Sequence, residues 1–168
     1  LRRRLEQESM ELHLQQLENQ INPHFLFNSL NSLSVLIGSD STLAKEFVLK
    51  LSKVYRYLLE TRNESLSTVK EEIEFTRQYY FLQKIRFGDQ LDLSIHVSQD
   101  CFEAKIPSIS LQMLVENAIK HNPDSENLSY IYLYFRVEHD ELTFTCENSK
   151  PLVPVKKETG GLGLSRSE

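Results

Sequence analysis

Three groups of residues in this sequence have the types and spacing that chemistry requires. One group recurs every three or four residues and therefore shares a helix face: His24, Asn28 and Asn31. A second group fills the polar side of another predicted helix: Glu116, Asn117, Lys120 and His121. The third is the glycine-rich run 160–164, whose backbone can approach a phosphate group closely and offer it N–H donors. Taken alone, a glycine run of this kind is more typical of a loop connection.

The helix that carries His24 has two interpretations. Apolar residues form one stripe before Pro23 and a second, out-of-phase stripe after it: Met10, Leu14, Leu17 and Ile21, then Leu26, Leu30, Leu33 and Ile37. In the first interpretation the helix continues through a kink at Pro23, its core-facing side changes there, and the polar group around His24 turns away from the core. In the second, Asn22-Pro23 is a capped helix start and His24 is an ordinary first-turn residue.

A second helix follows the first and completes a helical hairpin. The segment Gly38–Ser41 supplies turn and N-cap residues, and apolar residues recur at helical spacing from Ala44 to Leu58. A lone hairpin of this size exposes a long apolar face, so we expect it to pair with a copy of itself into a four-helix bundle. The periodicity lapses at Thr61–Ser65, which predicts a domain boundary between residues 1–64 and 65–168.

The second part mixes helices and strands. Helical spacing covers Val69–Phe87 and returns between Leu111 and Ile119, where it leaves the polar group of Glu116 on the other side. Alternation of apolar and polar residues predicts three strands: Leu91–Val97, Tyr130–Val137 and Leu142–Cys146. We therefore predict an α+β fold in which helices cover one face of a sheet.

Composition narrows the classes of function. The chain has 168 residues, of which 40% are hydrophobic and 26% charged, so it is neither disordered nor fibrous. A net charge of -5 argues against a nucleic-acid partner. Cys101 and Cys146 have no second Cys or His at metal-binding spacing, which argues against a zinc site and against a disulfide framework. A reducing compartment fits this cysteine usage. No apolar run reaches the roughly 18 to 20 residues that a membrane span needs. Because the chain begins with Leu1, we expect a piece of a longer protein, with any membrane segment upstream.

Two long motifs carry a resemblance to a known family. The segments 20–31 (QINPHFLFNSLN) and 114–121 (LVENAIKH) are similar to those of the LytS/YehU-type sensor histidine kinases, and the likeness extends from Leu14 to Leu164. Shorter stretches agree with it, among them Lys84–Gly88 and the Ile106-Pro107 pair. The resemblance implies a dimeric phosphoacceptor domain followed by a Bergerat-type ATP-binding domain, the fold of gyrase, Hsp90 and MutL.

The resemblance also implies roles for individual residues. His24 corresponds to the phosphoacceptor, which suits an imidazole because its neutral nitrogen can attack the γ-phosphoryl group of ATP. Asn28, one turn later, would hydrogen-bond the imidazole or position a water, or is a solvated helix residue. Asn117 corresponds to the ligand of Mg²⁺, beside Glu116 as a base or as the residue that orients a metal-bound water. Lys120 and His121 lie within reach of the same nucleotide.

Two departures from the family pattern affect the ATP-binding domain. Where related ATPases read Asp-x-Gly at the adenine site, this chain has Glu147-Asn148-Ser149, so either Glu147 or Asn148 would contact adenine. Gly161 and Gly163 correspond to the glycines that flank the phosphates. The sequence ends soon after them, without the helix and strand that follow in the family, so the domain is expected to be C-terminally incomplete.

The resemblance implies a sensor histidine kinase of a two-component system. Such an enzyme uses ATP and Mg²⁺ to phosphorylate His24 and passes the phosphoryl group to the receiver domain of a response regulator. We expect a homodimer from the cytoplasmic region of a bacterial inner-membrane protein. Two alternatives stay open: a non-catalytic dimerisation module derived from a kinase, and an ATPase of the same fold that uses Glu116 as its general base.

Overall fold

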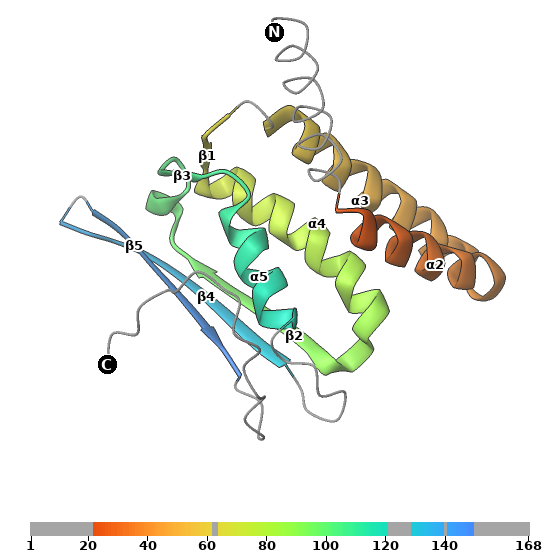
Figure 1. The fold of residues 1–168 in the computed structure, drawn as a ribbon. Helices are drawn as coiled ribbons and strands as arrows, with labels where there is room; N and C mark the ends of the chain where they lie inside the picture. Colours follow the sequence, from red (N-terminus) through yellow and green to blue (C-terminus); the bar gives the residue numbers. More distant parts are fainter. Residues whose placement is uncertain (1–21, 62–63, 121–128, 140, 150–168) are drawn as a thin grey trace, which may run out of the picture.

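The computed structural model describes residues 22–61, 64–120, 129–139 and 141–149 (Figure 1). The helices are α2 (Pro23–Ser39), α3 (Ser41–Glu60), α4 (Val69–Phe87) and α5 (Ser110–Lys120), with short 3₁₀ turns at Gly88–Gln90 and Gln99–Cys101. The strands are β1 (Leu66–Thr68), β2 (Leu91–Val97), β3 (Lys105–Pro107), β4 (Ser129–Glu138) and β5 (Glu141–Asn148). Among the described residues, no helix has both the length and the apolar composition that crossing a membrane requires. The predicted α+β class is confirmed.

Helices α2 and α3 form the predicted hairpin, and a single residue joins them. The backbone N–H of Asp40 donates to the carbonyl of Leu36 at 2.8 Å and so closes α2. The Asp40 carboxylate then accepts from the N–H groups of Thr42 (3.0 Å) and Leu43 (2.9 Å) and caps the start of α3. Because Asp40 caps both helices, it is the only residue between the end of α2 and the start of α3.

The face of α2 that packs within the chain differs from the predicted one. The buried residues of α2 are Phe25, Ser29 and Leu36. Leu30 is 47% exposed and Ile37 is 66% exposed, although both belong to the stripe expected to face the core. The prediction was wrong for these two residues, because Phe25 packs against α3 and α4, but Leu26 and Leu33 of the same stripe are half-buried and Leu33 packs against the core.

Helix α4 is the central layer of the molecule, with the hairpin on one side and the sheet on the other (Figure 1). A capping box fixes its start: the Glu71 backbone N–H donates to Thr68 Oγ1 at 3.2 Å, and the Thr68 N–H donates to Glu71 Oε2 at 2.8 Å. Buried residues lie on both sides of α4, among them Val69, Ile73, Phe75, Tyr79 and Leu82. This position explains why α4 has only a weakly one-sided apolar pattern.

The three predicted strands form one sheet in the order β2-β4-β5, with β2 parallel and β5 antiparallel to β4. The helix-covered face carries the buried side chains Ile131, Leu133 and Phe135. The other face carries Tyr130, Tyr132 and Tyr134. A separate antiparallel ribbon of β1 and β3 was not predicted, because three residues in each strand are too few to show alternation.

Candidate functional site

His24 lies in the first turn of α2, where the helix start is built by its neighbours. The Asn22 side chain accepts from the Phe25 N–H at 3.2 Å, and Pro23 occupies the first helical position, as expected of a capped start. The predicted capped start at Asn22-Pro23 is therefore confirmed, whereas the role of His24 stays a prediction and the stripe of residues 10–21 lies outside the described residues. His24 is exposed, and Asn28 Nδ2 lies 3.2 Å from both ring nitrogens.

Phe25 anchors this turn to the rest of the molecule. Only 9% of the residue is exposed, and its ring centroid lies 5.1 Å from that of Tyr79 on α4 and 6.2 Å from that of Tyr55 on α3. Consecutive residues point about 100° apart around a helix. Burial of Phe25 therefore fixes the direction of the neighbouring imidazole.

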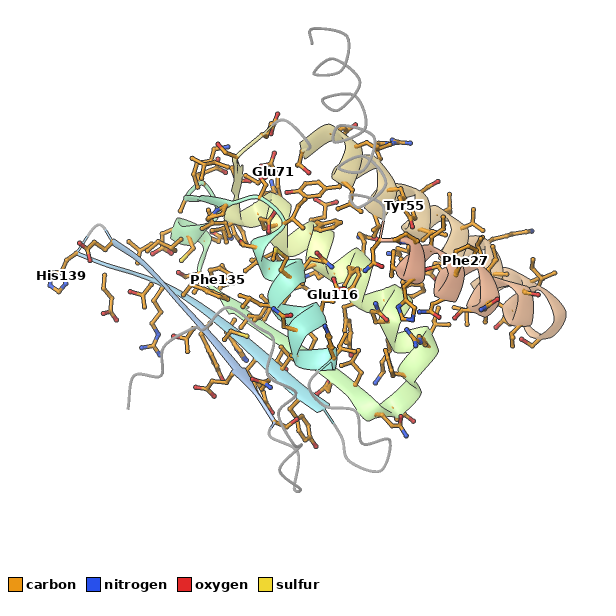
Figure 2. All side chains as sticks on the ribbon, viewed as in Figure 1. Phe27, Tyr55, Glu71, Glu116, Phe135 and His139 are labelled. Atoms are coloured by element: carbon orange, nitrogen blue, oxygen red, sulfur yellow. The ribbon has the colours of Figure 1, made fainter. Side chains whose placement is uncertain are left out.

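Glu116 connects helix α5 to the start of α2, 94 residues earlier in the chain. Asn22 Nδ2 donates to Glu116 Oε1 at 3.1 Å, and Gln112 Nε2 donates to Glu116 Oε2 at 2.6 Å. Figure 2 shows the labelled Glu116 on the side of α5 that faces the hairpin. Each carboxyl oxygen thus has an amide donor, and the carboxylate has a fixed position beside the His24 turn.

A cleft of about 410 Å³ brings these groups together at the junction of α2, α4 and α5. Its lining residues are Asn22, His24, Phe25, Asn28, Tyr79, Gln83, Arg86, Phe87, Glu116, Ile119 and Lys120. Two cationic side chains, Arg86 and Lys120, and one carboxylate, Glu116, share the cleft with the imidazole of His24. The cleft therefore combines an imidazole with side chains that can bind an anion and accept a proton.

The wall of the cleft also contains polar groups that sequence reasoning did not select. Burial, with a smaller effect of the Glu116 charge, raises the pKa of Tyr79 to about 12, and Gln83 Nε2 donates to its hydroxyl at 2.7 Å. Arg86 belongs to the Lys84–Gly88 stretch that resembles the family, but a basic residue in a last helical turn is equally explained by the helix dipole. Only the three-dimensional position of Arg86 identifies it as a cleft residue.

Asn117 follows Glu116 in α5 but is not among the residues that line the cleft. It is exposed, whereas Glu116, Ile119 and Lys120 line the cleft. Within the described residues, no cluster of three or more His, Cys, Asp or Glu side chains could hold a metal ion. The predicted site residues His121, Gly161 and Gly163 lie outside the described residues.

The two candidates for the adenine contact lie on opposite faces of the sheet. Residues paired across an antiparallel ladder point to the same face. Asn148 pairs with Ile131 and therefore lies on the helix-covered face, while Glu147 pairs with Tyr132 on the open face. Asn148 Nδ2 donates to the carbonyl of Ser149 at 3.2 Å.

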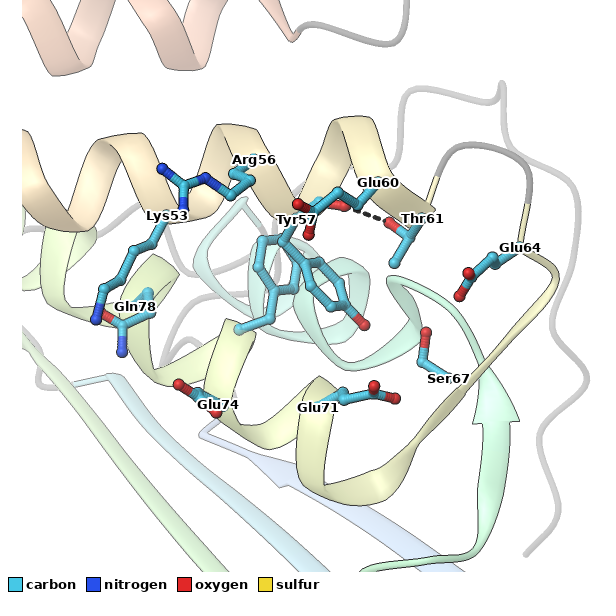
Figure 3. A pocket seen from close by; sticks show the side chains of 11 residues that line it. Lys53, Arg56, Tyr57, Glu60, Thr61, Glu64, Ser67, Glu71, Glu74 and Gln78 are labelled. Atoms are coloured by element: carbon cyan, nitrogen blue, oxygen red, sulfur yellow. Dashed lines mark hydrogen bonds between the residues drawn. The ribbon is translucent and has the colours of Figure 1, made fainter.

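A second cavity, of about 450 Å³, lies at the other end of the helical layer, between α3, β1 and α4. Figure 3 shows Lys53 and Arg56 of α3 opposite Glu71 and Glu74 of α4, with Tyr57 between them. The predicted site residues lie elsewhere, and this cavity has mixed charge without a defined ligand arrangement.

Beneath that cavity, a buried carboxyl group ties three elements together. Glu72 of α4 is 0% exposed. It accepts from Tyr57 Oη of α3 at 2.8 Å, and from the backbone N–H groups of Ile109 (2.7 Å) and Leu111 (3.3 Å) at the start of α5. The Tyr57 ring also stacks on Phe75, with centroids 4.4 Å apart. Ile109 has a positive φ of 66°, which is strained for a β-branched residue, and its N–H donates to this carboxyl group.

Comparison with known proteins agrees with the geometry. The family model described as "Histidine kinase" matches residues 12–91, which include α2, α3 and α4. The chain is 34% identical over 157 residues to proteins named "Sensor protein kinase HptS" from Staphylococcus aureus strains USA300, NCTC 8325 and N315. The match covers 94% of this chain and 28% of each relative, so the chain spans little more than a quarter of their length. With its His24 motif on a capped helix start and its Glu116-Asn117 helix beside it, the chain belongs to the sensor histidine kinase family, of the LytS/YehU type.

Proposed function

We propose that the protein is an ATP-dependent histidine kinase that phosphorylates His24 and then transfers the phosphoryl group to an aspartate on a response-regulator receiver domain. One observation carries the proposal: His24 shares a cleft with Glu116 and Lys120, which belong to the same helix as Asn117. A phosphohistidine is a high-energy P–N species, so it suits relay to an aspartate better than storage.

Each described residue of the cleft has a role in this proposal. A ring nitrogen of His24 attacks the γ-phosphorus as the bond to the β,γ-bridging oxygen breaks and ADP leaves, and Glu116 accepts the proton that the imidazole loses. Asn28, whose Nδ2 lies 3.2 Å from both ring nitrogens, holds the direction of the imidazole before transfer and releases the lone-pair nitrogen when that nitrogen attacks. Lys120 and Arg86 offset the charge of the phosphoryl oxygens. Catalysis then consists mainly of positioning and electrostatics, as in other phosphoryl transfers.

The nucleotide would be held by side chains that fit its chemistry. The exposed amide oxygen of Asn117 is a hard ligand suited to Mg²⁺, which would offset the negative charge of the phosphate groups. Asn148, on the helix-covered face, has an amide that can pair with adenine. Gly161, Gly163 and His121 complete the proposed ATP site by resemblance to the family. The domain that holds these residues would have the Bergerat-type ATP-binding topology.

We also propose that the hairpin mediates homodimerisation. Two apolar grooves of about 770 and 590 Å³ run along α2 and α3. Among the exposed apolar residues of these helices are Leu30, Ile37, Val48, Leu49 and Leu59. Pairing with a second hairpin would bury this surface in a four-helix bundle. In the whole protein, the chain would then be the cytoplasmic kinase region of a membrane-bound sensor.

The first test is incubation of the full-length protein with γ-labelled ATP and Mg²⁺. We expect an acid-labile, alkali-stable label that is lost in both His24→Ala and Asn117→Ala. Asn31→Ala is the matched control, because Asn31 is exposed on the same helix outside the cleft and should label normally.

Other outcomes of this test would contradict the proposal. Label that persists in His24→Ala would place the phosphoacceptor elsewhere. A folded protein that gains thermal stability with ATP but takes no label would be an ATPase or an ATP-dependent clamp. A protein with neither label nor nucleotide effect would be a dimeric interaction module.

A further inference from the structure

The turn that carries His24 is joined by a hydrogen bond to α5, the helix of the same chain that carries Asn117 and Lys120. Asn22, two residues before His24, donates to Glu116 at 3.1 Å, and Phe25, the residue after it, is buried between Tyr55 and Tyr79. One side of the imidazole turn is therefore fixed by a hydrogen bond to α5, and the other by aromatic packing on α3 and α4.

A second set of contacts holds the far end of the hairpin. Tyr57 of α3 stacks on Phe75 and donates to Glu72, which in turn accepts from the backbone at the start of α5. Helix α5 is thus tied to the hairpin near both of its ends, through Glu72 at the first turn and through Glu116 near the last.

Chain connectivity keeps these contacts within one molecule. Helix α3 ends at Glu60 and β1 begins at Leu66, a separation that spans at most about 20 Å when fully extended. The hairpin and the α4–α5 layer also share a buried core that includes Phe25, Val54 and Tyr79. A partner's α5 could take the place of this chain's own α5 beside the His24 turn only after these contacts separate.

We infer that phosphorylation occurs in cis: His24 takes the γ-phosphoryl group from ATP bound by its own chain, not by the partner in the dimer. This inference rests on the proposed kinase function. A bond forms between the imidazole nitrogen and the γ-phosphorus as the bond to the β,γ-bridging oxygen breaks. ADP leaves with that electron pair, and the imidazole proton passes to Glu116. Each ATP site therefore phosphorylates His24 of its own chain, which lies two residues after the Asn22 that donates to Glu116.

Mixed dimers of the full-length protein test this inference. One dimer pairs a His24→Ala subunit with an Asn117→Ala subunit of different tag length. Transfer in cis predicts no more label than the two parent homodimers take, because neither subunit has both parts. Label on the Asn117→Ala subunit would overturn the inference.

A second dimer gives the opposite pattern and serves as the matched control. It pairs a wild-type subunit with a subunit that carries both substitutions. Transfer in cis predicts label on the wild-type subunit at about half the amount in a wild-type dimer, since one of two active chains remains. Transfer between subunits predicts none, which would overturn the inference.

The failure of the proposed function is distinguishable, because it would leave the wild-type homodimer unlabelled. If the protein remains monomeric, a labelling rate per molecule that does not change on dilution supports transfer in cis. A rate that falls on dilution contradicts it.

Discussion

At the scale of single residues, Asn22 combines two functions in one amide. Its oxygen accepts from the Phe25 N–H and caps α2, while its nitrogen donates to Glu116. An aspartate at this position would still cap the helix but would face Glu116 with a second negative charge. The two functions of the side chain can therefore be separated by one substitution.

We predict that Asn22→Asp slows labelling of His24 about tenfold or more, while the KM for ATP stays nearly unchanged. The reason is that the His24 turn is no longer held against Glu116, and a loss of about 1.4 kcal/mol in transition-state stabilisation slows the reaction by a factor of ten. Labelling rates over a range of ATP concentrations would measure this split. Asn31→Asp makes the same chemical change at an exposed site of the same helix and should label at the wild-type rate. A higher KM with an unchanged maximal rate would show that Asn22 affects nucleotide binding instead.

Phe25 gives a second prediction at this scale. Its ring is almost fully buried between two tyrosines, so Phe25→Ala should lower the free energy of unfolding by about 3 kcal/mol. Phe27, two residues later, is 66% exposed and lies outside both apolar grooves, and Phe27→Ala should change the free energy by less than about 0.5 kcal/mol. Urea unfolding of both variants measures the difference, and equal losses would contradict the proposed anchoring role of Phe25.

At the scale of elements, the start of α4 depends on pH through its capping box. Hydrogen bonds from the backbone and hydroxyl of Thr68 lower the pKa of Glu71 below its ordinary value of 4.5. A lowered folded-state pKa means that the stabilisation is present above the unfolded pKa and is lost as the pH falls through the folded value. Protonated Glu71 no longer accepts these bonds as a carboxylate.

We therefore expect Glu71→Gln to be less stable than the wild type at pH 7, with the difference shrinking as the pH falls below 4.5. Urea unfolding at several pH values measures it. Glu74→Gln is the matched control, because Glu74 is exposed on the same helix and lies outside the capping box. A difference that grows on acidification would show that the sign of this linkage is wrong.

Elements with a clear period were predictable from sequence, and contacts between distant segments were not. The hairpin, α4, α5 and the three strands of the sheet have apolar repeats long enough to recognise. The strands β1 and β3 do not, and their pairing joins residues about 40 positions apart. Glu72 has the appearance of an ordinary surface residue in the run 71–74, although it is fully buried. Its burial depends on donors from Tyr57 and Ile109, which no local pattern reveals.

In the candidate site too, some residues were predictable from sequence and their arrangement in space was not. His24, Asn28 and Glu116 were selected from sequence by resemblance, and the structure places all three in one cleft. Which apolar residues of α2 pack inward was not predictable, because the buried Phe25 and Leu36 and the exposed Leu30 and Ile37 lie on the same short helix. The choice between Glu147 and Asn148 required the strand register, since a shift of one residue exchanges the two faces of a strand.

At the scale of the whole molecule, the outward face of the hairpin predicts assembly. Val48 is 45% exposed and lines both apolar grooves. A charge at its position would have to be desolvated on pairing, so Val48→Asp should shift the protein from dimer to monomer. Sedimentation or light scattering over a range of concentrations measures the shift. Met113→Asp adds the same charge to an exposed residue of α5 and should leave the dimer intact. Dissociation by both variants would place the interface elsewhere.

The buried carboxyl group of Glu72 also determines how motion passes through this molecule. Its donors come from α3 and from the start of α5, and it has no access to water that could replace them. A small displacement of α3 would remove the Tyr57 donor while the carboxyl group stays buried, at a cost of about 1 to 3 kcal/mol. Intermediate positions of α3 are therefore disfavoured relative to a fully seated or a fully released one. A signal that arrives along this hairpin is then expected to act above a threshold, as a step and not as a graded response.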